Sequence, residues 1–417
     1  MKIILLHDSF PPYSFGGGGI SVQGIAAVLK KIGHDVSVIT TCRKESEEGV
    51  FDCEGIRVFR IASDYSERWR AYRSLYNNKV VHKVEEIFKK IGPDVVHINS
   101  IHHHLSYHCL KLARQQSEVV IFTARDVMLF NFGKLQTSKY LRNFDYRTTW
   151  HDHIKQARKR WNPFRNFIIK RYLRYADKVF AISKSLRDAL NQNDIEHVEV
   201  IYNGIDVSEW LVDQRIVVDF QTKYSLQGRR VILFGGRLSA AKGAEKTLEA
   251  LVKIVKEIPN ATLLVMGKID WYAQVMKGYA RDLDIEEHLV FTGWIKGDEI
   301  RAAYAASNVV LMPSICFDSF GRINIEAMAS KKPVIGTCYG GTPEIVDDGV
   351  TGYIVNPMYP EEIAEKTLDL LKNPERADRF GKAGYERVKS HFNLEDKVKE
   401  YIAVYEALLE EKKSGPM

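Results

Sequence analysis

The stretch VVLMPSICFDSFGRINIEAMASKKPVIG, residues 309–336, carries the pattern that decides the fold class. It opens with an apolar run that is typical of a buried strand, and after a short loop it continues as a helical pattern from about Gly321. A second apolar run, PVIG, then predicts another strand. A helix between two such strands indicates a parallel sheet, because parallel neighbours need a long crossover connection.

The same alternation runs along both halves of the 417 residues. In the first half we expect strands at 2–8, 35–40, 94–99, 119–124, 178–183 and 198–203. In the second half we expect strands at 230–236, 261–267, 289–293, 309–314, 333–336 and 352–355, with a helix over 243–257. The pattern predicts an α/β protein of two doubly wound, Rossmann-like parallel-sheet domains that face each other across a cleft.

The expected boundaries follow from where the alternation restarts, near NGIDVSEWLVD at 203–213. The first domain is predicted to span 1–212 and the second 213–395. Residues 396–417 are predicted to form an amphipathic helix that packs back toward the first domain, with its apolar stripe formed by Val398, Tyr401, Ile402, Tyr405, Leu408 and Leu409.

Composition and charge narrow the class of protein. The five cysteines are scattered without a CxxC pair, which indicates free thiols and a reducing compartment. No apolar run is long enough for a signal peptide or a membrane span, so we expect a soluble cytoplasmic protein. The net charge of +7 is uneven: residues 1–212 hold 32 basic and 23 acidic side chains, whereas residues 213–417 hold 28 and 30.

A glycine run, Gly16–Gly19, follows the first strand and precedes a helix. Glycines at a helix start let backbone N–H groups approach an anion or a sugar closely. A phosphate-binding P-loop is excluded because no Lys-Ser/Thr pair follows, and a dinucleotide fingerprint is disfavoured because its third glycine and its strand-end acid are missing. A flexible loop remains the alternative.

The second domain opens with VILFGGRLSAAKGAEKTLEAL, in which Arg237 and Lys242 follow a strand. An arginine and a lysine that converge there would offset the charge of a diphosphate. The alternative is that Lys242 is solvated surface, as most lysines are.

Two carboxylates complete the pattern in the opening stretch. Asp318 lies in the loop before the predicted helix and Glu326 lies on it. The helix start is an anion site, whereas carboxylates accept hydrogen bonds from hydroxyls. Together they suit a ligand with phosphates in its middle and sugar hydroxyls at both ends, which is a nucleotide sugar. The alternative is that Asp318 only stabilises the helix through its dipole and that Glu326 is a solvated surface residue.

Taken together and in this order, these motifs resemble the family-four (group 1) retaining glycosyltransferases of GT-B fold. The resemblance rests on PPYSFGGGG, DVVHIN, GRLSAAKG, MPSICFDSFGRINIEAMASKKPVIG, GGTPEIVDDGVTG and YIAVYEALL, which span almost the whole chain. The E-x7-E element of the family stands here as D-x7-E, from Asp318 to Glu326.

The resemblance implies a role for each site residue. Arg237 and Lys242 should hold the donor diphosphate, Asp318 the transferred sugar and Glu326 the ribose. Backbone N–H groups should line the diphosphate from Phe320, Gly321, Arg322 and Ile323, and the donor phosphate and the acceptor should be bordered by Gly17, Gly18 and Gly19. The resemblance also implies that neither a cofactor nor a metal is needed, and that the first domain binds the acceptor and the second the donor.

The chain departs from the family pattern at several positions. The first acid is the shorter Asp318, and Arg322 and Asn324 occupy places that are usually apolar or small. Arg125 stands where many members carry a histidine close to the transferred sugar. An arginine cannot act as a base there, although it can bind a donor oxygen. An ion pair with Asp126 is the alternative for Arg125, and His97 or the run His102–His104 are other candidates for the histidine's task.

A basic segment at 155–174 interleaves cations with aromatic and aliphatic residues. This composition suits a helix on an anionic membrane face. A solvated helix that packs its own apolar residues inward is the alternative, and no motif indicates nucleic acid.

The sequence therefore predicts an enzyme that binds a nucleotide sugar. The resemblance implies a glycosyltransferase that moves the sugar from a nucleoside-diphosphate sugar to a hydroxyl acceptor, with retention and without metal, in glycolipid or surface-polysaccharide synthesis. The acceptor would be a sugar, a lipid-linked or a small molecule. Two alternatives stay open: a GT-B epimerase of nucleotide sugars, and a catalytically silent relative that only binds nucleotide sugar or membrane.

Overall fold

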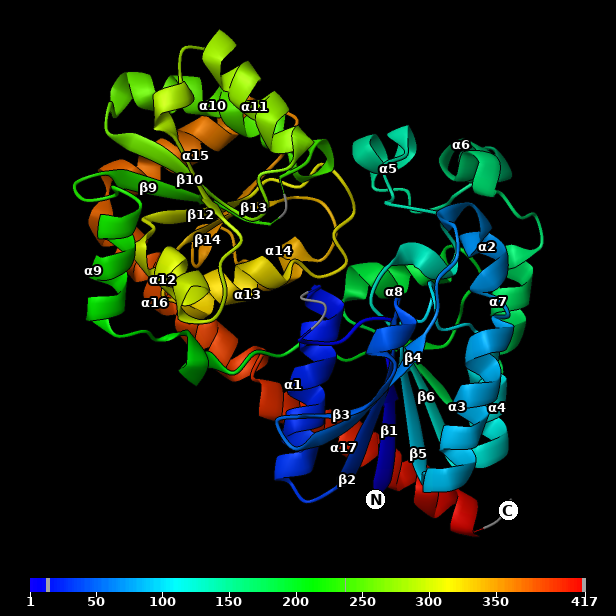
Figure 1. The fold of residues 1–417 in the computed structure, drawn as a ribbon. Coiled ribbons are helices and arrows are strands. Elements are labelled where there is room, and N and C mark those ends of the chain that lie inside the picture. Colours follow the sequence, from blue (N-terminus) through cyan, green and yellow to red (C-terminus); the bar gives the residue numbers. More distant parts are fainter. Residues whose placement is uncertain (13–15, 237, 415–417) are drawn as a thin grey trace. The chain divides into compact units, whose positions relative to one another are not determined.

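The computed structural model describes residues 1–12, 16–236 and 238–414. The chain divides into two compact units (Figure 1). The first comprises Met1–Gly204 together with Leu394–Met417, and the second comprises Ile205–Asn393. Each is described by itself.

The first unit contains an eight-stranded sheet in the order β3-β4-β2-β1-β5-β6-β7-β8. All neighbouring pairs are parallel except β3 and β4, which form an antiparallel hairpin at one edge. Its strands are β1 (Lys2–Leu6), β2 (Asp35–Cys42), β3 (Gly49–Cys53), β4 (Ile56–Ala62), β5 (Val95–Asn99), β6 (Val119–Ala124), β7 (Lys178–Ala181) and β8 (Val198–Val200).

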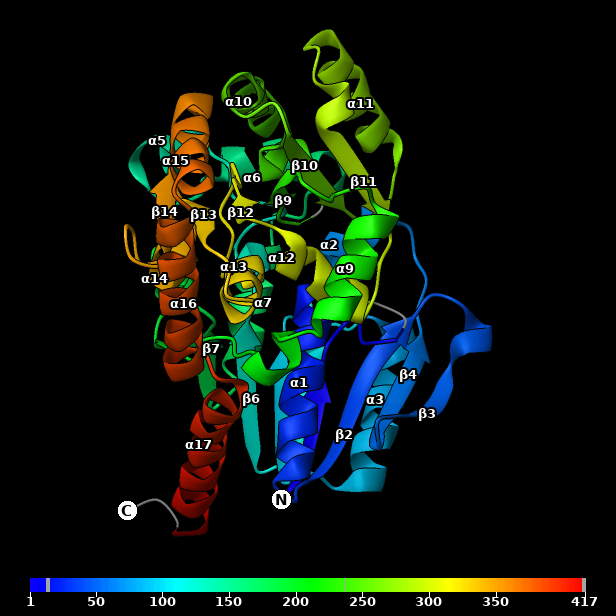
Figure 2. The same ribbon diagram turned by 90° about the vertical axis from the view of Figure 1, so that its left-hand side faces the viewer.

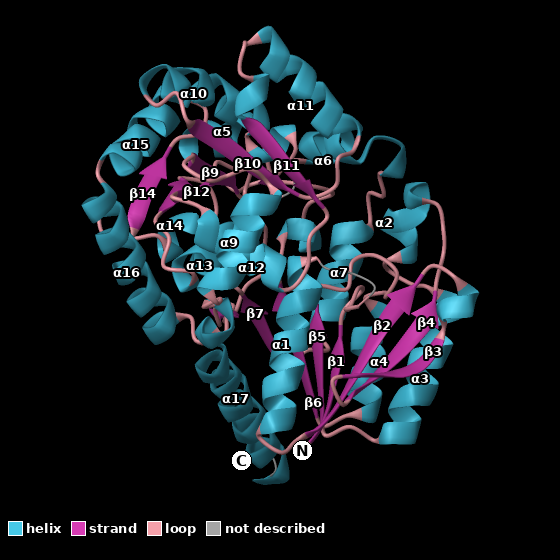
Figure 3. Cartoon of the chain, turned by 60° about the vertical axis from the view of Figure 1, so that its left-hand side comes forward, coloured by secondary structure: helices cyan, strands magenta, loops and turns pink. Residues whose placement is uncertain are grey.

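Helices cover both faces of this sheet (Figure 3). The helices of this unit are α1 (Gly17–Lys31), α2 (Arg70–Arg73), α3 (Asn78–Ile91), α4 (His108–Gln116), α5 (Ser138–Asn143), α6 (Trp150–Ala157), α7 (Arg165–Leu173), α8 (Lys184–Asn191) and α17 (Leu394–Ser414), of which α5 and α6 lie beyond the strand ends. Ile3 and Leu5 of β1 face a core shared with α1 and α17, while Ile4 and Leu6, also fully buried, face the other layer. Burial on both faces explains why the central strands are continuous apolar runs.

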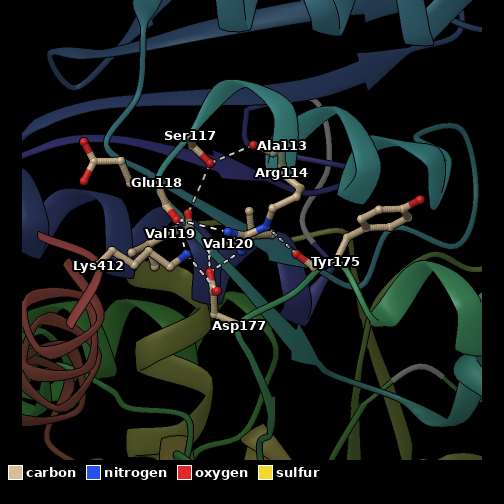
Figure 4. A network of polar contacts seen from close by, with 9 residues as sticks. All are labelled: Ala113, Arg114, Ser117, Glu118, Val119, Val120, Tyr175, Asp177 and Lys412. Atoms are coloured by element: carbon tan, nitrogen blue, oxygen red, sulfur yellow. Dashed lines mark hydrogen bonds and ion pairs between the residues drawn. The ribbon is translucent and has the colours of Figure 1, made fainter. Parts of the chain in front are cut away.

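The C-terminal helix α17 is fastened to the first unit along its length. Val398, Tyr401 and Tyr405 lie in the core beside α1. Near the end of the helix, Lys412 Nζ lies 2.8 Å from Asp177 Oδ1 and also donates to the carbonyl oxygen of Glu118 (Figure 4). The predicted apolar stripe therefore forms the buried face of this helix.

The second unit contains a six-stranded parallel sheet in the order β11-β10-β9-β12-β13-β14. The strands are β9 (Arg230–Phe234), β10 (Ala261–Met266), β11 (Leu289–Gly293), β12 (Val309–Met312), β13 (Val334–Thr337) and β14 (Gly352–Val355). Pairing registers Leu233 with Val310 and Val310 with Val334. The carboxyl ends of β9, β12 and β13 therefore lie at one edge.

Helices cover this sheet on both faces as well (Figure 2). They are α9 (Gln214–Lys223), α10 (Ala244–Glu257), α11 (Trp271–Asp282), α12 (Asp298–Ala306), α13 (Arg322–Ala329), α14 (Thr342–Ile345), α15 (Pro360–Lys372) and α16 (Pro374–His391). One core joins the sheet to α10, α11 and α15 through Leu248, Leu251, Met276 and Ile363. The predicted fold class, α/β with two doubly wound parallel sheets, is confirmed.

The basic segment at 155–174 only partly matches the predicted surface helix. The packing alternative expected Ile168, Tyr172 and Leu173 to be buried. Leu173 of α7 is buried, together with Ile169, whereas Ile168 and Tyr172 are only partly buried. Arg165 belongs to this basic segment, but it is buried, contrary to the prediction of a surface cation, and donates to the carbonyl oxygens of Met128 and Asn131. No helix within the described ranges has the length and apolar content to cross a bilayer.

Candidate functional site

In the second unit, the loop after β9 leads to Lys242, one of the two predicted basic residues. Arg237 lies outside the described residues. Lys242 ends the 3₁₀ helix η6 (Ala240–Lys242), and Gly243 follows it with a φ of +76°. A Cβ at Gly243 would lie 2.1 Å from the carbonyl oxygen of Pro313, so only glycine allows this close approach to the end of β12. The loop therefore holds Lys242 against the loop that carries Asp318.

Lys242 and Asp318 form an ion pair across these two loops. Their side chains are 22% and 19% exposed, so the pair is neither solvated surface nor sealed core. Asp318 Oδ1 also accepts a hydrogen bond from the backbone N–H of Gly321 at 3.1 Å, and its carbonyl oxygen accepts one from Gly341 at 2.8 Å. Asp318 is thus fixed through both its side chain and its backbone.

Glu326 is held one turn further along α13. Its Oε2 accepts a hydrogen bond from the hydroxyl of Tyr304 at 2.8 Å, and its Oε1 accepts one from Arg322 Nε at 2.7 Å. Burial raises the pKa of Tyr304 well above its ordinary value, and the negative charge of Glu326 raises it further. The hydroxyl of Tyr304 therefore stays protonated and can donate. Sequence reasoning missed Tyr304, which comes from α12 and carries no motif.

The first turn of α13 begins at Gly321, whose φ of +77° makes it the residue that turns the chain into the helix. The side chain of Phe320 is buried and contacts Phe392. The side chain of Ile323 packs against Gly235, where a Cβ would lie 2.6 Å from it. Because both side chains point into the unit, a ligand at this turn would meet backbone groups, together with the Arg322 side chain.

In the first unit, the glycine run forms the start of α1. Gly17, Gly18 and Gly19 make up its first turn, and a Cβ at Gly19 would lie 2.7 Å from the carbonyl oxygen of Ser9. A Cβ at Gly18 would lie 2.7 Å from Nε2 of His7. Two of these glycines are therefore required by contacts within the unit.

Arg125 follows β6 and is 8% exposed. Its Nε and Nη2 donate to Asn99 Oδ1 at 3.1 and 2.8 Å, and its Nη1 donates to Asn203 Oδ1 at 2.6 Å. The neighbouring Asp126 caps η3 (Val127–Leu129) by accepting from the N–H of Met128, and it faces His102 at 3.4 Å. Two asparagine side chains thus fix the guanidinium at the carboxyl edge of the first sheet.

The candidate histidines divide between core and edge. His97 is fully buried and contacts the hydroxyl of Tyr405 at 2.6 Å, so it binds the C-terminal helix. The run His102–His104 lies in a loop held by the carboxylate of Asp8, which accepts N–H bonds from His102, His103 and Leu105 at 2.9, 2.8 and 2.6 Å. Burial raises the pKa of Asp8 to about 7, although the three N–H hydrogen bonds act to lower it.

The two edges allow different chemistry. The second offers a lysine in the loop after β9, together with an aspartate, a glutamate and a helix start in the segment from β12 to α13. These groups can bind phosphates and hydroxyls together. The first offers a rigid guanidinium and a glycine turn beside neutral imidazoles. Family models match both units: residues 15–209 match Glycosyltransferase Family 4, and residues 219–387 match Glycosyl transferases group 1. The chain belongs to this family of glycosyltransferases.

Individual relatives agree with that assignment. An uncharacterized glycosyltransferase of Methanocaldococcus jannaschii is 26% identical over 98% of this chain and 99% of its own length. Spore coat protein SA of Bacillus subtilis is 29% identical, but the match spans 50% of this chain and only 58% of the relative.

Solved structures resemble the chain over nearly all of its length. Sucrose-phosphate synthase of Thermosynechococcus elongatus superposes with a TM-score of 0.79 at 22% identity, over 98% of both chains. HepE of Anabaena, in complex with UDP and glucose, gives a TM-score of 0.73 at 18% identity, over 98% of this chain and all of HepE. At such identities the likeness defines the fold, which is GT-B.

Proposed function

We propose that the protein transfers a sugar from a nucleoside-diphosphate sugar to a hydroxyl acceptor, with retention of the anomeric configuration. The observation that carries the proposal is the ion pair that joins Lys242, in the loop after β9, to Asp318, in the loop that leads to Glu326 on α13. A nucleotide sugar, whose diphosphate lies between its ribose and its second sugar, matches this arrangement of one cation and two carboxylates that accept hydrogen bonds from hydroxyl groups.

Each residue has a role in this proposal. Lys242, together with Arg237, offsets the charge that develops on the leaving diphosphate, while backbone N–H groups of the α13 turn bind its oxygens. Asp318 accepts a hydrogen bond from the transferred sugar, and Glu326 accepts from the ribose. Because these groups supply the electrostatic stabilisation, the proposal needs no bound metal. In the first unit, Arg125 is fixed by Asn99 and Asn203, and its proposed role is to bind a sugar oxygen.

UDP-glucose is the first donor to test, because HepE has been solved with UDP and with UDP-glucose. Turnover would be followed as release of the nucleoside diphosphate with a panel of hexoside acceptors, with and without a chelator. The anomeric configuration of the product would be read by NMR. We expect an α-linked product, turnover that survives the chelator, and loss of turnover in R125A. A product with inverted anomeric configuration would contradict the proposal. Conversion of the nucleotide sugar in the absence of any acceptor would also contradict it.

We extend the proposal to association with an anionic membrane surface through the segment at 155–174. Phe164 and Phe167 are exposed beside the basic turn η4 (Arg158–Arg160). Aromatic side chains with flanking cations favour the interface of an anionic bilayer, and each cation contributes about 1 kcal/mol there. The protein should sediment with phosphatidylserine vesicles at low salt, and less so in the double variant F164S/F167S. Equal sedimentation with neutral vesicles would contradict a charge-based contact.

A further inference from the structure

His7 is a polar residue at the carboxyl edge of the first sheet to which the family pattern gives no role. It follows β1 directly, and its side chain is largely buried. Its Nδ1 lies 2.6 Å from the carbonyl oxygen of Ser9, and the N–H of Ser9 lies at 3.2 Å from the same nitrogen. Because the contact with the carbonyl oxygen is the shorter of the two, we assign the proton to Nδ1. Nε2 then carries a lone pair.

The surroundings of Nε2 show why this nitrogen is available to a ligand. Within the described ranges no hydrogen bond to His7 Nε2 is formed. The residue above it is Gly18 in the first turn of α1, where a Cβ would lie 2.7 Å from Nε2 and 3.8 Å from Cδ of Arg125. His7, Gly18 and Arg125, from three separate elements, therefore meet at one point. Burial, with Arg125 contributing, lowers the pKa of His7 to about 4, so the imidazole is neutral in neutral solution.

We propose that Nε2 of His7 accepts a hydrogen bond from a hydroxyl group of the sugar acceptor. The site has one lone pair that needs a donor, and a fixed guanidinium beside it. A cationic ligand would be repelled by Arg125, and an anion without an O–H or N–H group would have no proton to donate to Nε2. A hydroxyl satisfies both groups, because it donates to the imidazole while its oxygen lies near the positive charge. This inference rests on the proposed function and adds a binding residue to its acceptor side.

Histidine NMR tests the contact directly. The full chain, labelled with ¹⁵N-histidine, would be compared with H7N to identify the His7 signals, and titrated with methyl and n-octyl hexosides. We expect Nδ1 protonated, Nε2 unprotonated, and a shift of the Nε2 signal on addition of at least one hexoside. A proton on Nε2, or no shift with any hexoside, would overturn the proposal.

Two variants separate binding from folding. The amide of H7N can replace the Nδ1 hydrogen bond to Ser9 without reaching the Nε2 position, whereas the longer amide of H7Q reaches it. We expect H7N to keep the wild-type melting temperature and H7Q to melt slightly lower, because it lacks the Nδ1 hydrogen bond to Ser9. Both variants should keep the wild-type UDP affinity. H7N should weaken hexoside binding about tenfold, and H7Q should restore part of it. Equal hexoside binding in wild type and H7N would overturn the proposal. Failure of wild type to bind any nucleoside diphosphate would instead refute the proposed function. The two outcomes can be told apart because hexoside binding is measured in the absence of nucleotide.

Discussion

The two sheet edges hold their polar side chains in different ways. At the edge of the second sheet, the charged side chains form ion pairs: Lys242 pairs with Asp318, and Arg322 pairs with Glu326. At the edge of the first sheet, Asp8 is held by backbone N–H groups and Arg125 by the amide oxygens of Asn99 and Asn203.

This difference indicates what each edge can bind. A partly exposed ion pair can exchange a carboxylate for a phosphate at little cost, because both partners are charged oxygens. A buried charged side chain that is hydrogen-bonded to neutral groups does not exchange those groups for a ligand, so its position stays fixed. The second edge is therefore suited to a charged ligand, and the first to a neutral one that must be oriented.

The largest expected effect comes from removing the lysine of the second edge. K242A should lower turnover by about 10²–10³-fold, because a charge aimed at the leaving group is lost. The matched control is K246A, which breaks a lysine–glutamate pair with Glu249 on α10 away from the sheet edge. A similar loss in both variants, or a loss below tenfold in K242A, would refute a role for Lys242 in the reaction.

The carboxylate of the first edge should matter for stability. In D8N an amide NH₂ replaces one of the two oxygens that receive the N–H groups of the 102–105 loop, so we expect a loss of about 2–3 kcal/mol in the free energy of unfolding, measured in urea. The control D94N changes an aspartate that accepts a single N–H, from Lys2, and should cost far less.

The same variant has a pH signature. Because the folded-state pKa of Asp8 is raised to about 7 from 3.8, its proton stabilises the folded state at low pH, and this contribution is lost as pH rises through about 7. The stability difference between wild type and D8N should therefore shrink from pH 4 to pH 7. A difference that stays constant from pH 5 to pH 7 would show that the folded-state pKa of Asp8 is not raised.

Tyr304 should have a smaller effect, confined to ligand binding. Y304F removes one hydrogen bond to Glu326 and should weaken nucleotide affinity about 5–10-fold. Y353F is the control, because Tyr353 donates to Asp369 at 2.7 Å in the same unit but lies outside the α12–α13 pair. Calorimetric titration would measure both, and unchanged affinity in Y304F would show that Glu326 needs no such support.

The smallest effect is expected at the end of α17. K412A should lower the free energy of unfolding by about 0.5–1 kcal/mol, since its pair with Asp177 is partly exposed. K413A, one residue further on, should be neutral. A loss above 2 kcal/mol would show that the contacts in Figure 4 act as one network with Arg114.

Local pattern predicted much of this fold. The strands expected at 119–124, 289–293 and 352–355 have those bounds in the structure, since each is an apolar run with turn residues on both sides. The hairpin of β3 and β4 was not predicted, although Glu54 and Gly55 both have positive φ and form its two-residue turn. An acidic residue before glycine is the signal that could have indicated it.

The candidate site was predictable only where it is local in sequence. Asp318 and Glu326 lie on one loop and helix, so their spacing could be interpreted directly. Tyr304 and His7 act through contacts between elements, and nothing in the sequence near them specifies which atoms they meet. The exchange of Lys242 between Asp318 and a phosphate likewise depends on a tertiary contact. The assignment of roles to these residues stays a prediction.

Nucleotide binding tests the central claim most directly. The full chain would be melted with UDP, GDP, ADP, CDP and dTDP, each in large excess, beside K242A, E326A and H7N. A ligand at 100 times its dissociation constant contributes about 2.7 kcal/mol, which is a shift of a few degrees for domains of this size. We predict that one nucleoside diphosphate raises the melting temperature of wild type and H7N but not of K242A or E326A. No shift with any of the five, or a shift that both second-unit variants keep, would contradict the account.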